Sequence, residues 1–290
     1  MIIAPLYFTI ILPVFFRIRG DMVLKTILYS AILFLIFSEH NYVACGDSIK
    51  CFSKRLSSTV IYDSLELGSY LLSTDSLKIA AACAPLYGIT RCWDEPLQCC
   101  FYDGVHHKNI RQLPPWCHSS ANVGVIAVPM LALGACALFA QDIQLRTTAQ
   151  IFVLGLPFTW ATKRALKLGT FDCCLRPRNQ YFSRTARAHG GFPSGHMLEI
   201  AYMTTLIGLQ YGARWGAVLG VGAGFLAVDF VVCNRHYMSQ LVAGAALGIM
   251  FGVAANKLVE SKLMRMCTVS LSVEKDHATE LPVFQVAYAF

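Results

Sequence analysis

Residues 123–140 read VGVIAVPMLALGACALFA, an unbroken run of 18 apolar residues. A stretch of this length and composition is typical of a helix that crosses a membrane. Four further stretches with few charges follow, and the shorter of them would need flanking residues at the membrane interface. They are 147–162, 196–211, 215–228 and 238–256. The sequence therefore predicts five membrane spans between residues 122 and 258.

The composition of the 290-residue chain agrees with this prediction. Hydrophobic residues make up 56% and charged residues 14%, whereas about a quarter of the residues of an average soluble domain are charged. The stretch 58–91 is ambiguous and fits a kinked or two-part first core helix. We therefore expect an all-α fold, an integral membrane helical bundle with about six core helices.

The net charge of the chain is +7. In so hydrophobic a chain, this charge indicates basic loops on the inner side of a membrane or phosphate ligands. The sequence has no nucleic-acid-binding motif and no interleaving of basic and aromatic residues, so nucleic acid is not expected as a partner.

The ends of the chain predict three parts. They are a signal peptide or N-terminal anchor at 1–44, a membrane-embedded domain at 45–258 and a cytoplasmic tail at 259–290. Met22 and Lys25 precede the apolar stretch 26–37, which is the order of charged and apolar regions in a signal peptide. An uncleaved anchor is the alternative. The tail is assigned to the cytoplasm because basic residues follow from Lys257 onward.

Glycine recurs at every fourth position in the last two predicted spans. The two series are Gly216, Gly220 and Gly224, and then Gly244, Gly248 and Gly252. Small residues at this spacing let helix backbones approach closely in lipid. The pattern therefore predicts tight packing of these two spans against each other.

A polar loop at 92–121 is rich in cysteine and histidine. Its cysteines are Cys92, Cys99, Cys100 and Cys117. Their spacing lacks the paired C-x-x-C steps of a zinc site. If this loop faces an oxidising compartment, disulfides are the expected state.

Three polar pieces border the predicted spans within residues 163–240. They are Lys167 with Arg176-Pro177, Pro193-Ser194-Gly195-His196, and Asn234-Arg235-His236-Tyr237. Counting the spans between the pieces places all three at one membrane surface. The basic pair offers donors to an anion, and the serine begins a helix whose N-terminus favours anions. His196 and His236 add a proton donor and a nucleophile.

These motifs resemble those of the type 2 phosphatidic acid phosphatase superfamily, which also holds bacterial acid phosphatases and haloperoxidases. The family pattern is K-x6-RP, then PSGH, then SR-x5-H-x3-D. The PSGH piece is intact at 193–196. The resemblance extends over 45–258, and its strong motifs lie within 167–248.

The resemblance implies a role for each matching residue. The residues implied to bind the phosphoryl oxygens are Lys167, Arg176, Ser194 and Gly195, the last through its backbone. His196 is implied to protonate the leaving group. His236 is implied to attack phosphorus and form a phosphohistidine that water hydrolyses. The family implies no metal and no cofactor.

Three departures from the pattern fall within the motifs. Lys167 and Arg176 are separated by eight residues rather than six. Phe230 stands where the pattern has a phosphate-binding Arg, and Arg235 is a candidate to replace that Arg. Gln240 stands where the pattern has the Asp that orients the nucleophile. Gln240 can still accept an imidazole hydrogen bond, but replacing such an Asp by an amide can cost on the order of 10⁴ in rate.

The expected function is metal-independent hydrolysis of a lipid phosphate or diphosphate, of the phosphatidic acid or polyprenyl diphosphate class. One alternative is a catalytically impaired lipid-phosphate-binding or scaffold protein, which Phe230 and Gln240 favour. Another is a lipid phosphotransferase. The expected location is a bacterial inner membrane. The site should face the periplasm or a lumen, because an odd number of spans separates it from the cytoplasmic tail.

Overall fold

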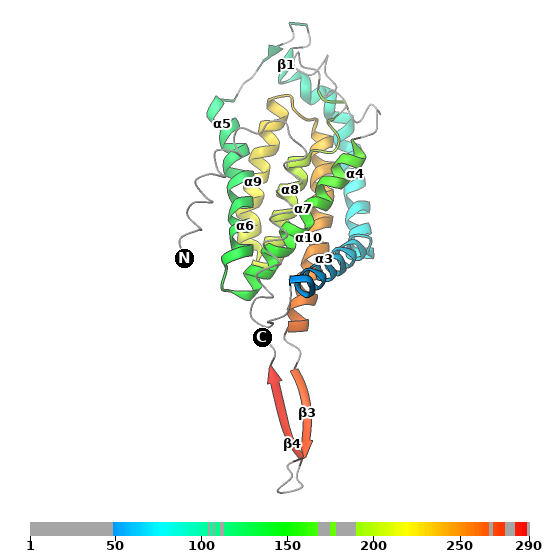
Figure 1. Ribbon diagram of the computed structural model, residues 1–290. Helices are drawn as coiled ribbons and strands as arrows, with labels where there is room; N and C mark the ends of the chain where they lie inside the picture. The colour runs from blue at the N-terminus through cyan, green and yellow to red at the C-terminus, as the bar shows by residue number, and fades with distance from the viewer. Residues whose placement is uncertain are drawn as a thin grey trace. The chain divides into compact units, whose positions relative to one another are not determined.

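The computed structural model describes residues 49–103, 105–106, 108–110, 113–167, 175–177, 190–266, 269–275 and 282–288. The chain divides into two compact units, Met1–Asp47 and Ser48–Phe290. The first unit contains the predicted signal peptide or anchor and lies outside the described residues. The second unit is a bundle of helices, shown in Figure 1.

Every apolar stretch that was predicted to span a membrane is a helix. The helices of the described residues are α3 (Ile49–Leu71), α4 (Thr74–Cys99), α5 (Pro115–Ser120), the π-helical η1 (Ala121–Ala127), α6 (Val128–Phe139), α7 (Ile143–Leu166), α8 (Gly195–Tyr211), α9 (Ala213–Val232) and α10 (Met238–Met266). The predicted all-α bundle is confirmed, and its six core helices are α4, the η1–α6 segment and α7 to α10. Among the described residues, α9 and α10 are the helices long and apolar enough to cross a membrane.

The ambiguous stretch at 58–91 is the predicted two-part helix. It comprises α3 and the first part of α4, which are separated by Leu72 and Ser73. The prediction of a polar loop from residue 92 is wrong at its start, because α4 continues to Cys99. Near its end, Asp94 is buried inside the bundle rather than solvated, whereas Glu95 is exposed.

Local signals explain where two of the core helices begin. Asp142 caps α7 by accepting a hydrogen bond of 2.6 Å from the backbone N–H of Leu145, as N-cap carboxylates do. Gly212 joins α8 to α9 with a φ of 94°, a backbone conformation that residues with a side chain rarely adopt.

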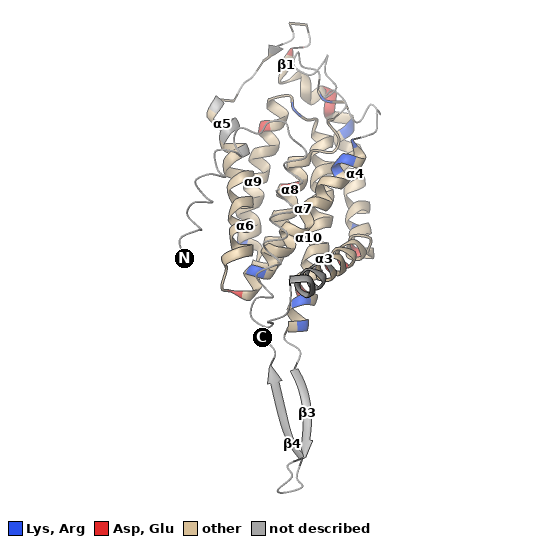
Figure 2. Ribbon diagram, in the orientation of Figure 1, with Lys and Arg blue, Asp and Glu red and all other residues tan. Residues whose placement is uncertain are grey.

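The surface of the bundle has the polarity expected of a protein surrounded by lipid. On α4, Leu86, Ile89 and Trp93 are exposed, whereas Asp94 and Gln98 are buried. In water this arrangement would expose apolar area and bury polar groups, both at a cost in free energy. The middle parts of α6, α8 and α9 are free of charged residues in Figure 2.

Glycine packing differs from the prediction. The α10 glycines face α8: a Cβ on Gly244 would lie 2.5 Å from the Ser194 carbonyl oxygen, and one on Gly248 would lie 2.4 Å from that of Leu198. In α9, Gly216 approaches Gly208 of α8. The predicted packing of the last two spans against each other is therefore wrong, because α8 takes the close contacts with both.

The basic end of α10 is held by acidic residues of α3 and α4. Lys257 pairs with Asp75 at 2.5 Å, and Arg265 pairs with Glu66 at 2.5 Å. Lys262 pairs with the buried Asp63. These ion pairs fix α3 against the last turns of α10.

Two short antiparallel hairpins complete the described residues. β1 (Tyr102–Asp103) pairs with β2 (Lys108–Asn109), and β3 (Val269–Lys275) pairs with β4 (Pro282–Tyr288). The first hairpin contacts the connection between α9 and α10, because the Asn234 side chain donates a hydrogen bond of 2.7 Å to the side chain of Asn109.

Candidate active site

The three polar pieces of the sequence meet in the folded chain. The Arg176 guanidinium donates a hydrogen bond of 3.0 Å to the carbonyl oxygen of Arg235, which joins the first piece to the third. The backbone N–H of Ser194 donates to the carbonyl oxygen of Gln240 at 3.1 Å, which joins the second piece to the third. The pieces therefore share one end of the bundle, as counting the spans predicted.

Phe230 packs against both histidines. Its ring centroid is 5.5 Å from that of His196 and 5.6 Å from that of His236. Phe230 itself is 1% exposed. The two imidazoles, far apart in the sequence, thus contact the same phenyl ring and belong to one site. His196 is exposed and His236 is buried, so an incoming ligand meets His196 first.

The side chain of Gln240 determines the tautomer of His236. Its Nε2 donates a hydrogen bond of 2.6 Å to the carbonyl oxygen of Leu175. This contact orients the amide, because only the nitrogen can donate to a carbonyl. Its Oε1 then faces Nδ1 of His236 at 3.2 Å, so Nδ1 carries the proton. The Nε2 atom of His236 is left with a lone pair, as a nucleophile requires.

A second contact supports this orientation of the amide. The backbone N–H of Tyr237 also donates to Oε1 of Gln240, at 3.3 Å. On the other side, Gly191 leaves room for the amide, since a Cβ there would lie 2.6 Å from Nε2 of Gln240. Gln240 therefore contacts the second and third polar pieces and Leu175, the residue before Arg176 of the first piece.

Basic residues surround the histidines and set their charge. Burial, together with the positive charges of Arg176 and Lys163, lowers the pKa of Lys167 to about 8. Burial and the charges of Arg176 and Lys167 lower the pKa of His236 well below its usual value. The predicted nucleophile is therefore neutral at physiological pH. Arg235, the candidate for the missing Arg, is half-buried in the loop beside His236.

The N-terminus of α8 provides the predicted anion-binding backbone. Ser194 is its N-cap residue and is fully buried, and its Oγ has no hydrogen-bond partner among the described residues. A buried hydroxyl without a partner is rare and calls for an explanation. It lies beside Gly195, the first residue of a 17-residue helix whose N-terminal N–H groups favour an anion.

Comparison with known proteins agrees with the motifs. Residues 156–263 match the family model described as the PAP2 superfamily. Over these residues the chain is thus similar to the PAP2 superfamily. This segment extends from the second half of α7 to the end of α10 and includes both histidines, which confirms the resemblance that the motifs indicated.

Two individual relatives are similar over different lengths. A stretch of 68 residues is 40% identical to "Lipid A 1-phosphatase" of Porphyromonas gingivalis, over 22% of this chain and 15% of that protein. The crystal structure of the first transmembrane PAP2 type phosphatidylglycerolphosphate phosphatase from Bacillus subtilis matches 71% of this chain and 98% of that chain. The sequence identity with it is 15% and the TM-score is 0.40.

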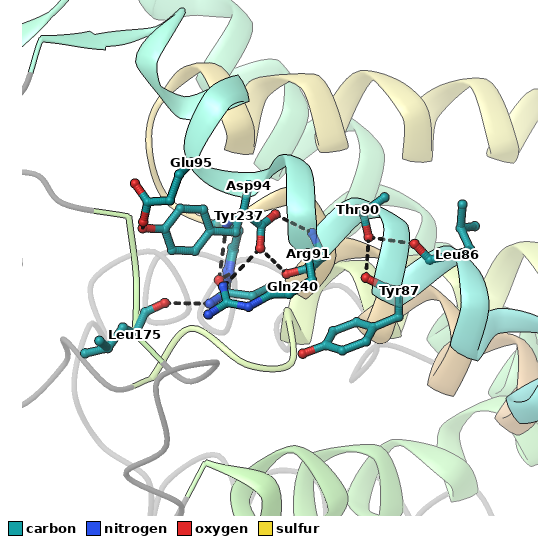
Figure 3. A network of polar contacts seen from close by, with 11 residues as sticks. Leu86, Tyr87, Thr90, Arg91, Asp94, Glu95, Leu175, Tyr237 and Gln240 are labelled. Atoms are coloured by element: carbon teal, nitrogen blue, oxygen red, sulfur yellow. Dashed lines mark hydrogen bonds and ion pairs between the residues drawn. The ribbon is translucent and has the colours of Figure 1, made fainter.

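The PAP2 motifs do not include a group of α4 residues that support the site, drawn in Figure 3. Asp94 accepts hydrogen bonds from the backbone N–H of Ser239 at 3.0 Å and from its hydroxyl at 2.5 Å. Arg91 donates to the same carboxylate at 3.1 Å, and Glu95 accepts from the Tyr237 hydroxyl at 2.9 Å. Because Asp94 binds the first turn of α10, it positions the helix that carries Gln240.

Lys163 is a second residue of the site that lies outside the PAP2 motifs. It precedes Lys167 by one helical turn on α7, and its Nζ lies 2.6 Å from Oε1 of Glu199 on α8. The i, i+4 spacing of the two lysines puts them on the same face of α7. That spacing is the signal by which the sequence could have indicated both.

The cysteines of the described residues are free thiols. They include Cys92, Cys99, Cys100 and Cys117, for which disulfides were expected in an oxidising compartment. Burial and the nearby Asp229 raise the pKa of Cys233 to about 11, and its thiol donates to the Asp229 carboxylate at 3.5 Å. Within the described part of the chain, no group of three His, Cys, Asp or Glu side chains is placed to hold a metal ion.

Proposed function

We propose that this protein is a metal-independent membrane phosphatase that hydrolyses a lipid phosphate or diphosphate through a phosphohistidine intermediate. The observation that carries the proposal is the Leu175–Gln240–His236 chain of hydrogen bonds. It holds the buried imidazole in the tautomer whose Nε2 can attack. The second histidine of the same site shares the Phe230 ring with it.

In the first step, Nε2 of His236 attacks phosphorus and the bond from phosphorus to the leaving oxygen breaks. His196, as the imidazolium, gives its proton to that oxygen. Lys167, Arg176 and the α8 N-terminus hold the remaining phosphoryl oxygens. Fixed donors of this kind stabilise the charge that develops in the transition state.

In the second step, water attacks the phosphorus of the phosphohistidine and the bond between phosphorus and Nε2 breaks. His196, now neutral, takes the proton of the attacking water. The products are inorganic phosphate and the original pair of histidines. Throughout both steps, Nδ1 of His236 keeps its proton and donates it in the hydrogen bond to Gln240.

The substrate is a phosphate group on a lipid because of where the site lies. It occupies one end of a bundle whose sides expose apolar residues, so a lipid can keep its tails in the bilayer while the headgroup reaches His196. Phosphatidic acid and polyprenyl diphosphates are the two classes that we propose. Lipid A is a third lipid phosphate to assay, because the relative from Porphyromonas gingivalis carries its name.

One observation favours the second candidate, a lipid-phosphate-binding or scaffold protein without turnover. Phe230 occupies the position of the phosphate-binding Arg of the PAP2 pattern, and it is buried and packs against both imidazoles. This protein would keep the anion-binding residues and bind a headgroup without cleaving it. A phosphotransferase would differ only in that an alcohol replaces water in the second step.

A phosphate-release assay separates these functions. The full chain is purified in detergent and supplied with a lipid phosphate in the presence of a chelator, beside a His236→Ala variant. Phosphate release that the substitution abolishes supports the phosphatase. Binding of several lipid phosphates without release supports the scaffold. A mass increase of one phosphoryl group, trapped by alkaline quenching, identifies the phosphohistidine.

We also propose that the site faces the periplasm or a lumen. The basic end of α10 lies at the opposite end of that helix from Gln240 and His236, and basic ends favour the cytoplasmic side. A reporter enzyme that is active only outside the cytoplasm, fused after residue 290, tests this. An active reporter would place the tail outside and contradict the proposed orientation.

A further inference from the structure

The side chain of Lys163 crosses over the first residue of α8. A Cβ built on Gly195 would lie 2.6 Å from Cδ of Lys163 and 3.1 Å from its Nζ. Any side chain at 195 would therefore displace the lysine. The glycine of the PSGH piece thus leaves room for an ammonium group next to the N-terminus of α8.

Glu199 holds the ammonium group in that place. Its Oε1 lies 2.6 Å from Nζ of Lys163, and the two side chains are 17% and 21% exposed. Because Glu199 follows Gly195 by one turn of the same helix, the ion pair fixes the lysine relative to α8. A lysine ammonium has three donors, so it can keep this partner and bind an oxygen of a second anion.

Independent observations point to an anion at this position. The Oγ of Ser194 is buried at the same helix N-terminus and has no partner in the part of the chain that the structure describes. The first N–H groups of a helix are also without intrahelical acceptors. A phosphoryl group placed there would accept from the hydroxyl, from the backbone and from Lys163 together.

We propose that Lys163, held over Gly195 by Glu199, binds a phosphoryl oxygen of the substrate and supplies the positive charge that Phe230 does not. This inference deepens the proposed function and rests on it for the identity of the substrate. Lys163 reaches the α8 N-terminus from α7, whereas Phe230 lies on α9 and packs against both histidines. The missing cation is therefore replaced from a different helix.

Binding of orthovanadate, a phosphate analogue that needs no turnover, tests the proposal on the full chain in detergent. Titration calorimetry compares the wild type with Lys163→Met, Lys163→Arg and Arg164→Met. Arg164 is the matched control, because it is the next residue of α7, is exposed and carries the same charge. We expect Lys163→Met to raise the Kd at least tenfold, Lys163→Arg to recover part of the affinity, and Arg164→Met to change it less than threefold.

A separate measurement of the Kd for orthovanadate tests the role of Glu199. Glu199→Gln should change the Kd for orthovanadate in the wild-type background and leave it unchanged in the Lys163→Met background, because Glu199 acts through Lys163. Equal changes in both backgrounds would show that Glu199 acts independently of the lysine and would overturn this part of the proposal.

The outcomes distinguish this proposal from the proposed function. If Lys163→Met and Arg164→Met weaken orthovanadate binding equally, while both elute and unfold like the wild type, Lys163 is not a ligand. Lipid phosphate hydrolysis by the wild type would then still support the phosphatase. Conversely, Lys163-dependent binding without any hydrolysis would support the ligand and reject the enzyme.

Discussion

The side-chain nitrogen of Gln240 lies 2.6 Å from the carbonyl oxygen of Leu175 and donates a hydrogen bond to it. Leu175 immediately precedes Arg176, so through Gln240 the predicted nucleophile His236 is linked to the backbone beside Arg176, a predicted phosphate-binding residue. The PAP2 pattern has Asp at this position, and an ionised Asp can only accept hydrogen bonds. Compared with the Asp of the pattern, Gln240 therefore lacks a negative charge but donates an additional hydrogen bond.

The first prediction concerns the pH dependence of kcat/KM. The nucleophile must be neutral, and burial and basic neighbours lower the pKa of His236 well below its usual value. Activity that depends on this group should therefore persist as the pH falls below the range where an ordinary histidine becomes protonated. In Gln240→Asp, the carboxylate favours the imidazolium, so the acid limb of the profile should move up by on the order of one pH unit. Superimposable acid limbs in the two proteins would contradict the proposed contact.

The second prediction concerns alkaline pH. Because the pKa of Lys167 is about 8, this residue loses its positive charge as the pH rises through that value. Phosphate binding should weaken, so the KM should increase between pH 7 and 9 while kcat changes less. Lys167→Arg keeps its charge throughout this range and should abolish the increase. A KM of the wild type that stays flat to pH 9 would show that Lys167 does not bind the phosphoryl group.

The third prediction concerns Asp94. Its carboxylate is 2% exposed and binds both the backbone and the hydroxyl of Ser239. Asp94→Ala leaves these donors and Arg91 without their acceptor, and losing such a buried partner costs about 1–3 kcal/mol. We expect a lower thermal unfolding midpoint in detergent, together with a fall in kcat, because the first turn of α10 also carries Gln240.

Asp75→Ala is the matched control for this prediction. Asp75 also lies on α4 and contacts α10, but its side chain is 48% exposed and lies at the other end of the bundle from the site. Its loss should change the unfolding midpoint less and leave kcat as it is. If the two variants behaved alike, Asp94 would have no special role in positioning the site.

The sequence predicted the helices well because long apolar runs depend on composition alone. It also brought His196, His236 and Arg176 together, since counting spans settles which ends of helices share a surface. The prediction that the two glycine-containing spans pack against each other was wrong for a different reason, which concerns the glycines. Their spacing shows that a helix has a face for close packing, but not which neighbour that face meets, and α8 rather than α9 packs against the α10 series.

The residues that support the site, Asp94 and Lys163, were not predicted from the sequence, and the reason is physical. Asp94 lies in a charged stretch that is typical of a solvated loop, and only its burial against Ser239 distinguishes it. Lys163 depends on Glu199 of another helix and on the absence of a side chain at Gly195. Each role is a relation between helices. The i, i+4 spacing of Lys163 and Lys167 indicates that they share a face of α7, but it does not indicate the residue of α8 that this face meets.

The last prediction concerns the two departures from the PAP2 pattern taken together. Phe230→Arg adds a further positive charge near Lys163, Lys167 and Arg176 in a buried position, where an unpaired charge is costly. It should therefore lower both stability and kcat/KM. Gln240→Asp alone should lower stability, because the bond to Leu175 is lost. In the double variant, Asp and Arg can pair across His236, so the combined loss should be smaller than the sum.

Measurements on the wild type, Phe230→Arg, Gln240→Asp and the double variant give the coupling free energy between positions 230 and 240. We expect a favourable coupling free energy of about 1 kcal/mol, the range found for residues in contact, both in unfolding midpoints and in kcat/KM. Losses that simply add would mean that positions 230 and 240 do not act on the same imidazole. The alignment of Phe230 with the Arg of the pattern would then be wrong, although its contacts with both histidines would remain.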